Sequence, residues 1–220
     1  MVNLIIVGTG AVAAELTTGI ETTNYYWNDE PIHIKGYLEF EEYRFLHKQY
    51  QYKKPILGMI DDYVIEDGDK FIIANANVSL RTQFAEKLRK RGAEFINLIH
   101  PSCIISPTSK MGIGNILSPY CQVGPVAKIG DFNILTSFSC ISHDCKVGSF
   151  NSFSSCIVCG HCIIGNNNCF YIRSSIIPHV TVGDNCIVQA GMTVDKNVPD
   201  DTTVFYRFKE KVMAIPKNGK

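Results

Sequence analysis

The sequence lacks an excess of either charge, because 21 lysines and arginines balance 21 acidic residues. A protein that binds nucleic acid through its phosphates carries a broad basic field, so we expect no nucleic-acid partner. The sequence also lacks any apolar run of about 18 residues, the length that a membrane-spanning helix needs. Its short apolar N-terminus has neither the basic flank nor the small-residue cleavage site of a signal peptide. We therefore expect a cytoplasmic protein without membrane insertion.

Cysteine is absent from the first hundred residues. All nine cysteines lie between Cys103 and Cys186. In a small secreted protein nine cysteines would indicate disulfides. Their confinement to one half of the chain instead indicates a structural cause.

The first hundred residues alternate between strand and helix patterns. Residues 2–7 read as a buried strand, Gly8-Thr9-Gly10 as a tight turn, and Ala11 to about Ile20 as a helix. An amphipathic helix is predicted over 78–91, stopped at Gly92. Further strands are predicted at Ile34–Phe40, Ile56–Ile60, Phe71–Ala74 and Glu94–Ile99. This alternation predicts a small Rossmann-like domain over residues 1–100, with a parallel sheet and helical crossovers.

After this region a six-residue period replaces the helical one. An aliphatic or aromatic residue recurs every six positions from Ile105 to Phe153 and, after a slip of one residue, from Val158 to Val194. Such a repeat predicts short flat strands joined by corners, three of which close one triangular coil. We therefore expect a left-handed parallel β-helix of about five coils over residues 101–200, followed by a C-terminal segment, 201–220. Small residues are expected near the tight corners, and the cysteines would be small buried hydrophobes.

The spacing Cys156-x-x-Cys159-x-x-Cys162 could also indicate a zinc or iron–sulfur site. In a β-helix, however, these residues would be spread along a strand and a corner. We predict that they are reduced and structural and that the protein holds no metal.

The Gly8-Thr9-Gly10 turn could hold a phosphate at the start of a helix. Ala13 stands where the full dinucleotide fingerprint has a third glycine, which argues against NAD. Two interpretations remain: the turn helps to seat a nucleotide-sugar, or it is purely structural.

His143-Asp144 forms a polar break in the apolar repeat. A histidine whose tautomer is fixed by a carboxylate is what general-base catalysis needs. Alternatively, Asp144 caps a corner and His143 is merely exposed, since His161 and His179 occupy similar positions. Adjacent strand residues point to opposite faces, so the pair can cooperate only at a corner.

Several motifs together carry a family resemblance. They are the Gly-rich strand–turn–helix start, Tyr37-Leu38-Glu39 after a strand, Ile99-His100-Pro101-Ser102 at the domain junction, and His143-Asp144-Cys145 in the repeat region. With these motifs the chain resembles the left-handed β-helix acyltransferases. That family includes the sialic-acid O-acetyltransferases and the nucleotide-amino-sugar N-acetyltransferases of bacterial glycan pathways.

The resemblance implies roles for particular residues. His143 would be the general base, and Asp144 would raise its basicity. The nucleotide-sugar would contact Gly10, Ala11, Val12, Glu39 and Phe40. Acetyl-CoA would lie in the groove between neighbouring β-helices of a homotrimer, at Ser152, Ile172 and Ala190.

The sequence departs from the family pattern at three places. Ala11-Val12-Ala13 replaces a loop with further glycine and a histidine, Ser152 replaces a second histidine, and Phe205-Tyr206-Arg207-Phe208 replaces a Gly-x-Pro-Ala segment. The favoured activity is N-acetylation of a nucleotide-linked amino sugar by acetyl-CoA. The alternatives are O-acetylation of a sugar hydroxyl, a different acyl donor, and a non-catalytic trimeric β-helix that binds sugar.

Overall fold

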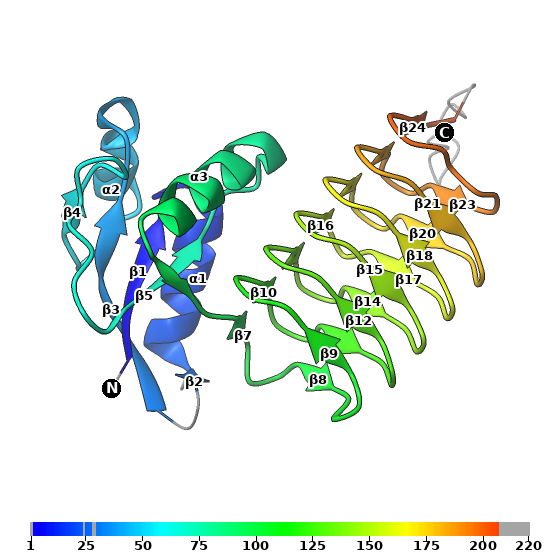
Figure 1. Ribbon diagram of the computed structural model, residues 1–220, viewed down its shortest axis with the longest axis horizontal. Coiled ribbons are helices and arrows are strands. Elements are labelled where there is room, and N and C mark those ends of the chain that lie inside the picture. The colour runs from blue at the N-terminus through cyan, green and yellow to red at the C-terminus, as the bar shows by residue number, and fades with distance from the viewer. Residues whose placement is uncertain (1, 24, 28–29, 207–220) are drawn as a thin grey trace, which may run out of the picture.

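The computed structural model describes residues 2–23, 25–27 and 30–206, and shows two parts in series (Figure 1). The predicted segment 201–220 is therefore described only as far as Tyr206, and Arg207 and Phe208 lie outside the described residues. In this part of the chain no helix has the length and apolar content that crossing a bilayer requires.

A six-stranded sheet forms the N-terminal domain, with spatial order β2-β3-β1-β5-β6 and β4 paired to β3. Its pairs are parallel except for β2 with β3. The strands are β1 (Val2–Val7), β2 (Tyr26–Trp27), β3 (Glu30–Leu38), β4 (Ile56–Gly58), β5 (Asp69–Ile73) and β6 (Glu94–Phe95). The central strand β1 is apolar along nearly its whole length because helices cover both of its faces.

Two long helices lie on opposite faces of this sheet. Helix α1 (Ala11–Thr22) packs Leu16 against Leu4 and Ile6 on one face, and α3 (Val78–Lys90) packs Phe84 against Ile5 on the other. The side chain of Asn77 caps α3 by accepting a hydrogen bond from the Leu80 N–H at 3.0 Å. A 3-10 turn (Glu41–Tyr43) and α2 (Phe45–Gln49) follow β3.

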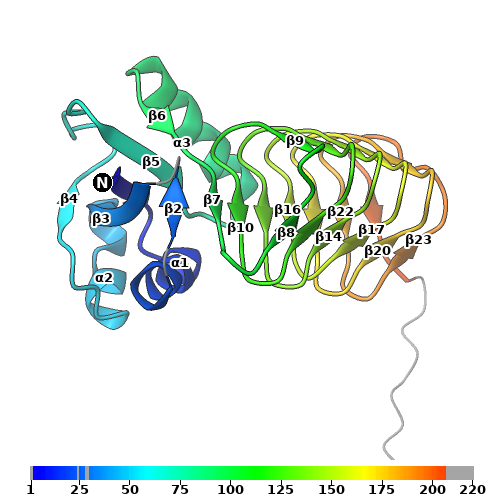
Figure 2. The same cartoon turned by 90° about the horizontal axis from the view of Figure 1, so that it is seen from below.

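Eighteen two-residue strands build the second part, stacked as three parallel sheets (Figure 2). The first sheet contains β7 (Leu98–Ile99), β10 (Ile116–Leu117), β13 (Ile134–Leu135), β16 (Ser152–Phe153), β19 (Cys169–Phe170), β22 (Ile187–Val188) and β24 (Thr203–Val204). The second contains β8 (Ile104–Ile105), β11 (Gln122–Val123), β14 (Cys140–Ile141), β17 (Ile157–Val158), β20 (Ser175–Ile176) and β23 (Thr193–Val194). The third contains β9 (Lys110–Met111), β12 (Lys128–Ile129), β15 (Lys146–Val147), β18 (Ile163–Ile164) and β21 (Thr181–Val182). The five strands of the third sheet correspond to five complete coils, which confirms the predicted α/β domain followed by a β-helix.

The prediction of one continuous strand over Glu94–Ile99 is wrong, because this segment forms two separate strands. Its first half is β6, which pairs with β5, and its second half is β7, which pairs with β10 of the β-helix. The apolar pattern runs through both halves, because each is buried in a different core. The first coil therefore begins at Leu98.

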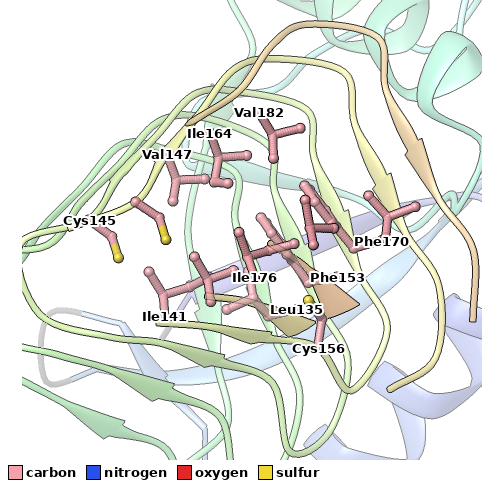
Figure 3. Packing of buried hydrophobic residues seen from close by; sticks show 14 of the residues in the cluster. Leu135, Ile141, Cys145, Val147, Phe153, Cys156, Ile164, Phe170, Ile176 and Val182 are labelled. Atoms are coloured by element: carbon pink, nitrogen blue, oxygen red, sulfur yellow. The ribbon is translucent and has the colours of Figure 1, made fainter. Parts of the chain in front are cut away.

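The second residue of each short strand points into the coil (Figure 3). Phe153 and Phe170 stack there with ring centroids 4.8 Å apart and planes 2° from parallel. All nine cysteines are free, and Cys145 and Cys156 are fully buried beside these apolar side chains. Burial raises the pKa of the Cys156 thiol to about 12, so this thiol stays neutral and acts as a small hydrophobe.

The corners differ from the expectation of small residues. The residue with a left-handed backbone conformation at successive corners is usually not glycine, as at Tyr120, Val126, Phe132, Phe138, Asp144, Phe150, Ser155, His161, Asn167, Arg173, His179 and Asn185. The repeat glycines serve another purpose. A Cβ on Gly148 would lie 2.6 Å from the Gly165 carbonyl oxygen, so these glycines allow neighbouring coils to approach closely.

A buried asparagine ladder, which the sequence analysis missed, runs along the corner between the third and first sheets. Asn115, Asn133, Asn151 and Asn168 are fully buried and recur once per coil. The Asn133 amide group donates to Asn115 Oδ1 at 3.0 Å and to the Gly148 carbonyl at 3.0 Å. The ladder thereby satisfies buried polar groups from one coil to the next.

Arg81 of α3 ties the two parts of the chain together. It is only 1% exposed, and its guanidinium donates to the carbonyls of Phe132 at 3.0 Å and Phe150 at 2.9 Å and to Ser152 Oγ at 2.9 Å. Burial lowers the pKa of Arg81 to about 10, which still leaves it charged at neutral pH. Through these bonds the N-terminal domain is fixed against the first sheet.

Candidate active site

His143 and Asp144 lie at the corner between β14 and β15, where the second sheet meets the third. Asp144 has a φ of 58°, and this turn brings together two side chains that would diverge on a strand. His143 Nδ1 lies 2.9 Å from Asp144 Oδ2. Both side chains are exposed, at 55% and 41%. The corner geometry that base and carboxylate require to cooperate is therefore present.

Two further histidines continue this corner in the next two coils. The His161 N–H donates to the His143 carbonyl at 3.1 Å, which sets the coils in register. The His143 and His161 rings meet edge to face at 5.2 Å, and the His161 and His179 rings stack at 4.8 Å, 4° from parallel. His161 Nε2 lies 3.9 Å from Asp144 Oδ2, so one carboxylate faces two imidazoles.

The five residues expected to contact the nucleotide-sugar line one cavity of about 440 Å³ in the N-terminal domain. They are Gly10, Ala11, Val12, Glu39 and Phe40. Helix α1 begins at this cavity, with Gly10 as its N-cap, so unpaired backbone N–H groups face it.

Glu39 is buried and has a role within the turn itself. Its carboxylate accepts hydrogen bonds from the Thr9 N–H at 2.6 Å, the Thr9 hydroxyl at 2.7 Å and the Phe40 N–H at 2.9 Å. The Tyr52 hydroxyl binds the Thr9 carbonyl at 3.0 Å. Through these bonds Glu39 fixes the conformation of the Gly8–Gly10 turn.

The three residues expected to contact acetyl-CoA do not all lie together. Ile172 and Ala190 line a shallow hollow of about 500 Å³ with Tyr171 and Gln189. Ser152 is not part of that lining, because it lies on β16 of the first sheet and its hydroxyl accepts the hydrogen bond from Arg81. No sequence signal indicated this contact.

A second cavity, of about 460 Å³, lies between α1 and the first sheet. It was not expected from the sequence. Val12, Tyr25, His100 and Ser118 are among its lining residues. Burial lowers the pKa of His100 and raises that of Tyr25 to about 12, so both are neutral at physiological pH. The only sequence signal was His100 in the junction motif.

Neither the family models nor the curated proteins contain a match to the chain, but solved structures do match. A mutant of perosamine N-acetyltransferase from Caulobacter crescentus, in complex with CoA and GDP-perosamine, is 21% identical, with a TM-score of 0.78 over 91% of this chain and 92% of that chain. The acetyltransferase domain of PglB from Neisseria gonorrhoeae is 21% identical, with a TM-score of 0.75 over 91% and 95%. This chain has the fold of these acetyltransferases. WeeI from Acinetobacter baumannii is 18% identical, with a TM-score of 0.57 over 92% and 96%.

The matches include both the N-terminal domain and the β-helix, since each covers more than nine tenths of both chains. The predicted left-handed β-helix acyltransferase architecture is therefore confirmed as a fold. At these identities the matches assign no role to any single residue of this chain.

Within one chain, the N-terminal cavity and the His143 corner are separate. The N-terminal domain packs on the first sheet through Ile116, Ile134 and Arg81, whereas His143 lies where the second and third sheets meet. No residue that lines the cavity belongs to this corner.

Over the described residues, one group of metal-ligating side chains converges, and it lies at this corner. Ligand atoms of His143, Asp144 and His161 are all within 4.8 Å of one another. In the same part of the chain, Cys156, Cys159 and Cys162 form no such group. Cys156 precedes β17, Cys162 precedes β18, and both side chains point into the coil.

Proposed function

We propose that the protein transfers the acetyl group of acetyl-CoA to the amine of a nucleotide-linked amino sugar, with His143 as general base. The contact of 2.9 Å between His143 Nδ1 and Asp144 Oδ2 carries this proposal. The fold shared with the two acetyltransferases supports it.

The neutral amine attacks the thioester carbonyl and loses a proton as the tetrahedral species forms. Asp144 binds the Nδ1–H tautomer of His143, so Nε2 is unprotonated and accepts that proton. The carboxylate then stabilises the imidazolium. Backbone N–H groups at a corner hold the oxyanion. As the tetrahedral species collapses, the C–S bond breaks and the CoA thiolate takes the proton from the His143 imidazolium, which restores the neutral base. No step needs a metal, so a chelator should not lower the rate.

The cavity at the start of α1 suits the diphosphate of a nucleotide-sugar, since unpaired helical N–H groups favour an anion. Gly10 leaves open space there, because a Cβ at this position would meet no other atom within 4 Å. Acetyl-CoA would lie at the hollow beside Ile172 and Ala190.

Separation of the cavity from His143 favours a homotrimer in which one subunit's corner faces another's cavity. Cyclic symmetry lets one surface build three identical grooves. Light scattering should give the mass of a trimer. A fully active monomer at micromolar concentration would contradict this arrangement.

The decisive experiment measures thiol release from acetyl-CoA with UDP-, dTDP- and GDP-linked 4-amino sugars. We expect release with at least one amino sugar and none with the matched 4-hydroxy sugars. Release with the hydroxy sugars alone would establish O-acetylation instead. Binding of a nucleotide-sugar without any release would establish the non-catalytic alternative.

A further inference from the structure

The corner that carries His143 holds more ligand atoms than a general base needs. A base and its orienting carboxylate are two groups, but His161 adds a third. Its Nε2 is 3.9 Å from the same carboxylate oxygen that lies 2.9 Å from His143 Nδ1. Two imidazoles and one carboxylate thus converge on one point at the surface.

We propose that His143, Asp144 and His161 bind a divalent transition-metal ion such as zinc, and that the bound ion blocks the general base. Two imidazole nitrogens and one carboxylate oxygen are ligands that zinc accepts, at about 2.0–2.2 Å from the ion. Tetrahedral ligands at that distance lie about 3.3 Å from one another. The observed separations of 2.9 and 3.9 Å lie on either side of this value.

The backbone keeps these side chains in place. The hydrogen bond from the His161 N–H to the His143 carbonyl aligns the two coils, and Asp144 and His161 both have left-handed backbones, with φ of 58° and 61°. All three side chains are exposed. Side-chain rotations would have to draw the ligand atoms, which lie within 4.8 Å of one another, closer together, and these exposed side chains are not part of the buried core.

The charge of the corner also suits a cation. Among the described residues, the ion-pair partners of Asp144 are the two imidazoles, and no lysine or arginine lies within ion-pair distance of its carboxylate. An ion held there replaces the proton that His143 shares with Asp144. The fourth zinc position stays open to water or substrate.

The consequence for catalysis follows from the single proton of neutral imidazole. When the metal takes Nδ1 of His143, that proton resides on Nε2. A protonated Nε2 cannot accept a proton from the attacking amine, so the zinc form is inactive. This consequence rests on the proposed function, whereas metal binding itself does not.

The experiment is a calorimetric titration of the full chain with Zn²⁺, repeated with Co²⁺ by absorption spectroscopy. We expect one ion per chain and no thiolate charge-transfer band. His161→Ala should weaken binding more than tenfold, because even loss of an outer-shell partner costs about 10–100-fold. His179→Ala is the matched control, since His179 occupies the same corner one coil further on but lies outside the ligand group. It should bind as the unsubstituted chain does.

Acetyl transfer provides the second measurement. Zn²⁺ should inhibit the unsubstituted chain and His179→Ala at the same concentration. Inhibition of His161→Ala should require a Zn²⁺ concentration more than tenfold higher. The proposal is overturned if His161→Ala binds Zn²⁺ as tightly as the unsubstituted chain, if both variants lose binding equally, or if Co²⁺ gives a thiolate band. A chain that binds Zn²⁺ through His161 but transfers no acetyl group would refute the proposed function and leave the metal site standing.

Discussion

The imidazole of His143 lies directly against Gly160 of the next coil. A Cβ built on Gly160 would come 2.6 Å from Cε1 and 2.7 Å from Nε2 of that ring. Gly160 does not have a positive φ, so the position requires the absence of a side chain rather than an unusual backbone. This glycine leaves the room in which the proposed base sits.

Gly160→Ala should therefore displace the His143 ring and lower kcat by more than about tenfold, up to the 10²–10⁴-fold that general-base catalysis contributes. The KM values should change little, because the residues proposed to bind the substrate and CoA line other parts of the surface. Steady-state kinetics would measure both. Pro178→Ala, in the equivalent position one coil further on, is the control and should keep full kcat. An unchanged kcat in Gly160→Ala would show that the ring position does not matter.

His143→Ala should lower kcat by about 10²–10⁴-fold, because it removes the proposed proton acceptor. Asp144→Asn should cost less, since the imidazole keeps a neighbour that hydrogen-bonds but loses the charge that stabilises its protonated form. Acetyl transfer at saturating substrates gives the order of the two effects. Retention of more than about a third of kcat in His143→Ala would exclude it as the base. Circular dichroism and light scattering on the same samples would reveal a loss of fold or assembly.

The six-residue period predicted the β-helix because each short strand places one apolar side chain inside the coil. This requirement is visible in the sequence as an apolar residue at every sixth position. The same pattern contains no backbone angle, so it could not show that bulky residues such as Val126 and Phe132 take the left-handed corner positions. The contact between Ser152 and Arg81 was equally hidden, since it joins residues 71 positions apart. The pairing of His143 with Asp144 could be predicted only on the condition that both lie at a corner.

The asparagine ladder should be a main support of the β-helix. Asn133→Ala removes the side-chain bonds to Asn115 Oδ1 and to the Gly148 carbonyl, and leaves the Asn151 N–H without its acceptor. Each buried group left unpaired costs about 1–3 kcal/mol, so the free energy of unfolding should fall by several kcal/mol. Urea titration would measure the loss. Asn185→Gly, at an exposed corner, should change it by less than about 1 kcal/mol, and equal effects of both variants would refute the role of the ladder.

Val126 is a β-branched residue in the left-handed region, with a φ of 62° and half of its surface exposed. That conformation costs about 1–2 kcal/mol for an ordinary residue, whereas asparagine tolerates it. Val126→Asn should therefore raise the free energy of unfolding by about 1 kcal/mol, measured by thermal or urea denaturation. Val126→Ile keeps the branch and should leave stability unchanged. A loss of stability in the asparagine variant would mean that packing of the valine outweighs its strain.

Asp69 should make the N-terminal domain sensitive to acid. Burial alone would raise its pKa, but hydrogen bonds from Lys35 Nζ at 2.6 Å, the Glu66 N–H at 2.9 Å and the Tyr63 hydroxyl at 2.7 Å outweigh burial and lower the pKa below its ordinary value. A carboxyl whose pKa is lower in the folded state stabilises the fold at pH values above its unfolded pKa of about 3.9. That stabilisation is lost as the pH falls through the folded pKa.

Asp69→Asn should consequently lower the free energy of unfolding at pH 7, and the difference from the unsubstituted chain should shrink below about pH 4. Urea titrations at a series of pH values would measure this difference. Glu66→Gln is the control, because Glu66 contacts the same lysine but its side chain is 67% exposed, so its charge should matter little at any pH. If the free energies of unfolding of Asp69→Asn and the unsubstituted chain differ by the same amount from pH 7 to pH 3, the charge of Asp69 is not what stabilises the fold. The hydrogen bonds of Asp69 would then be equally effective when its carboxyl group is protonated.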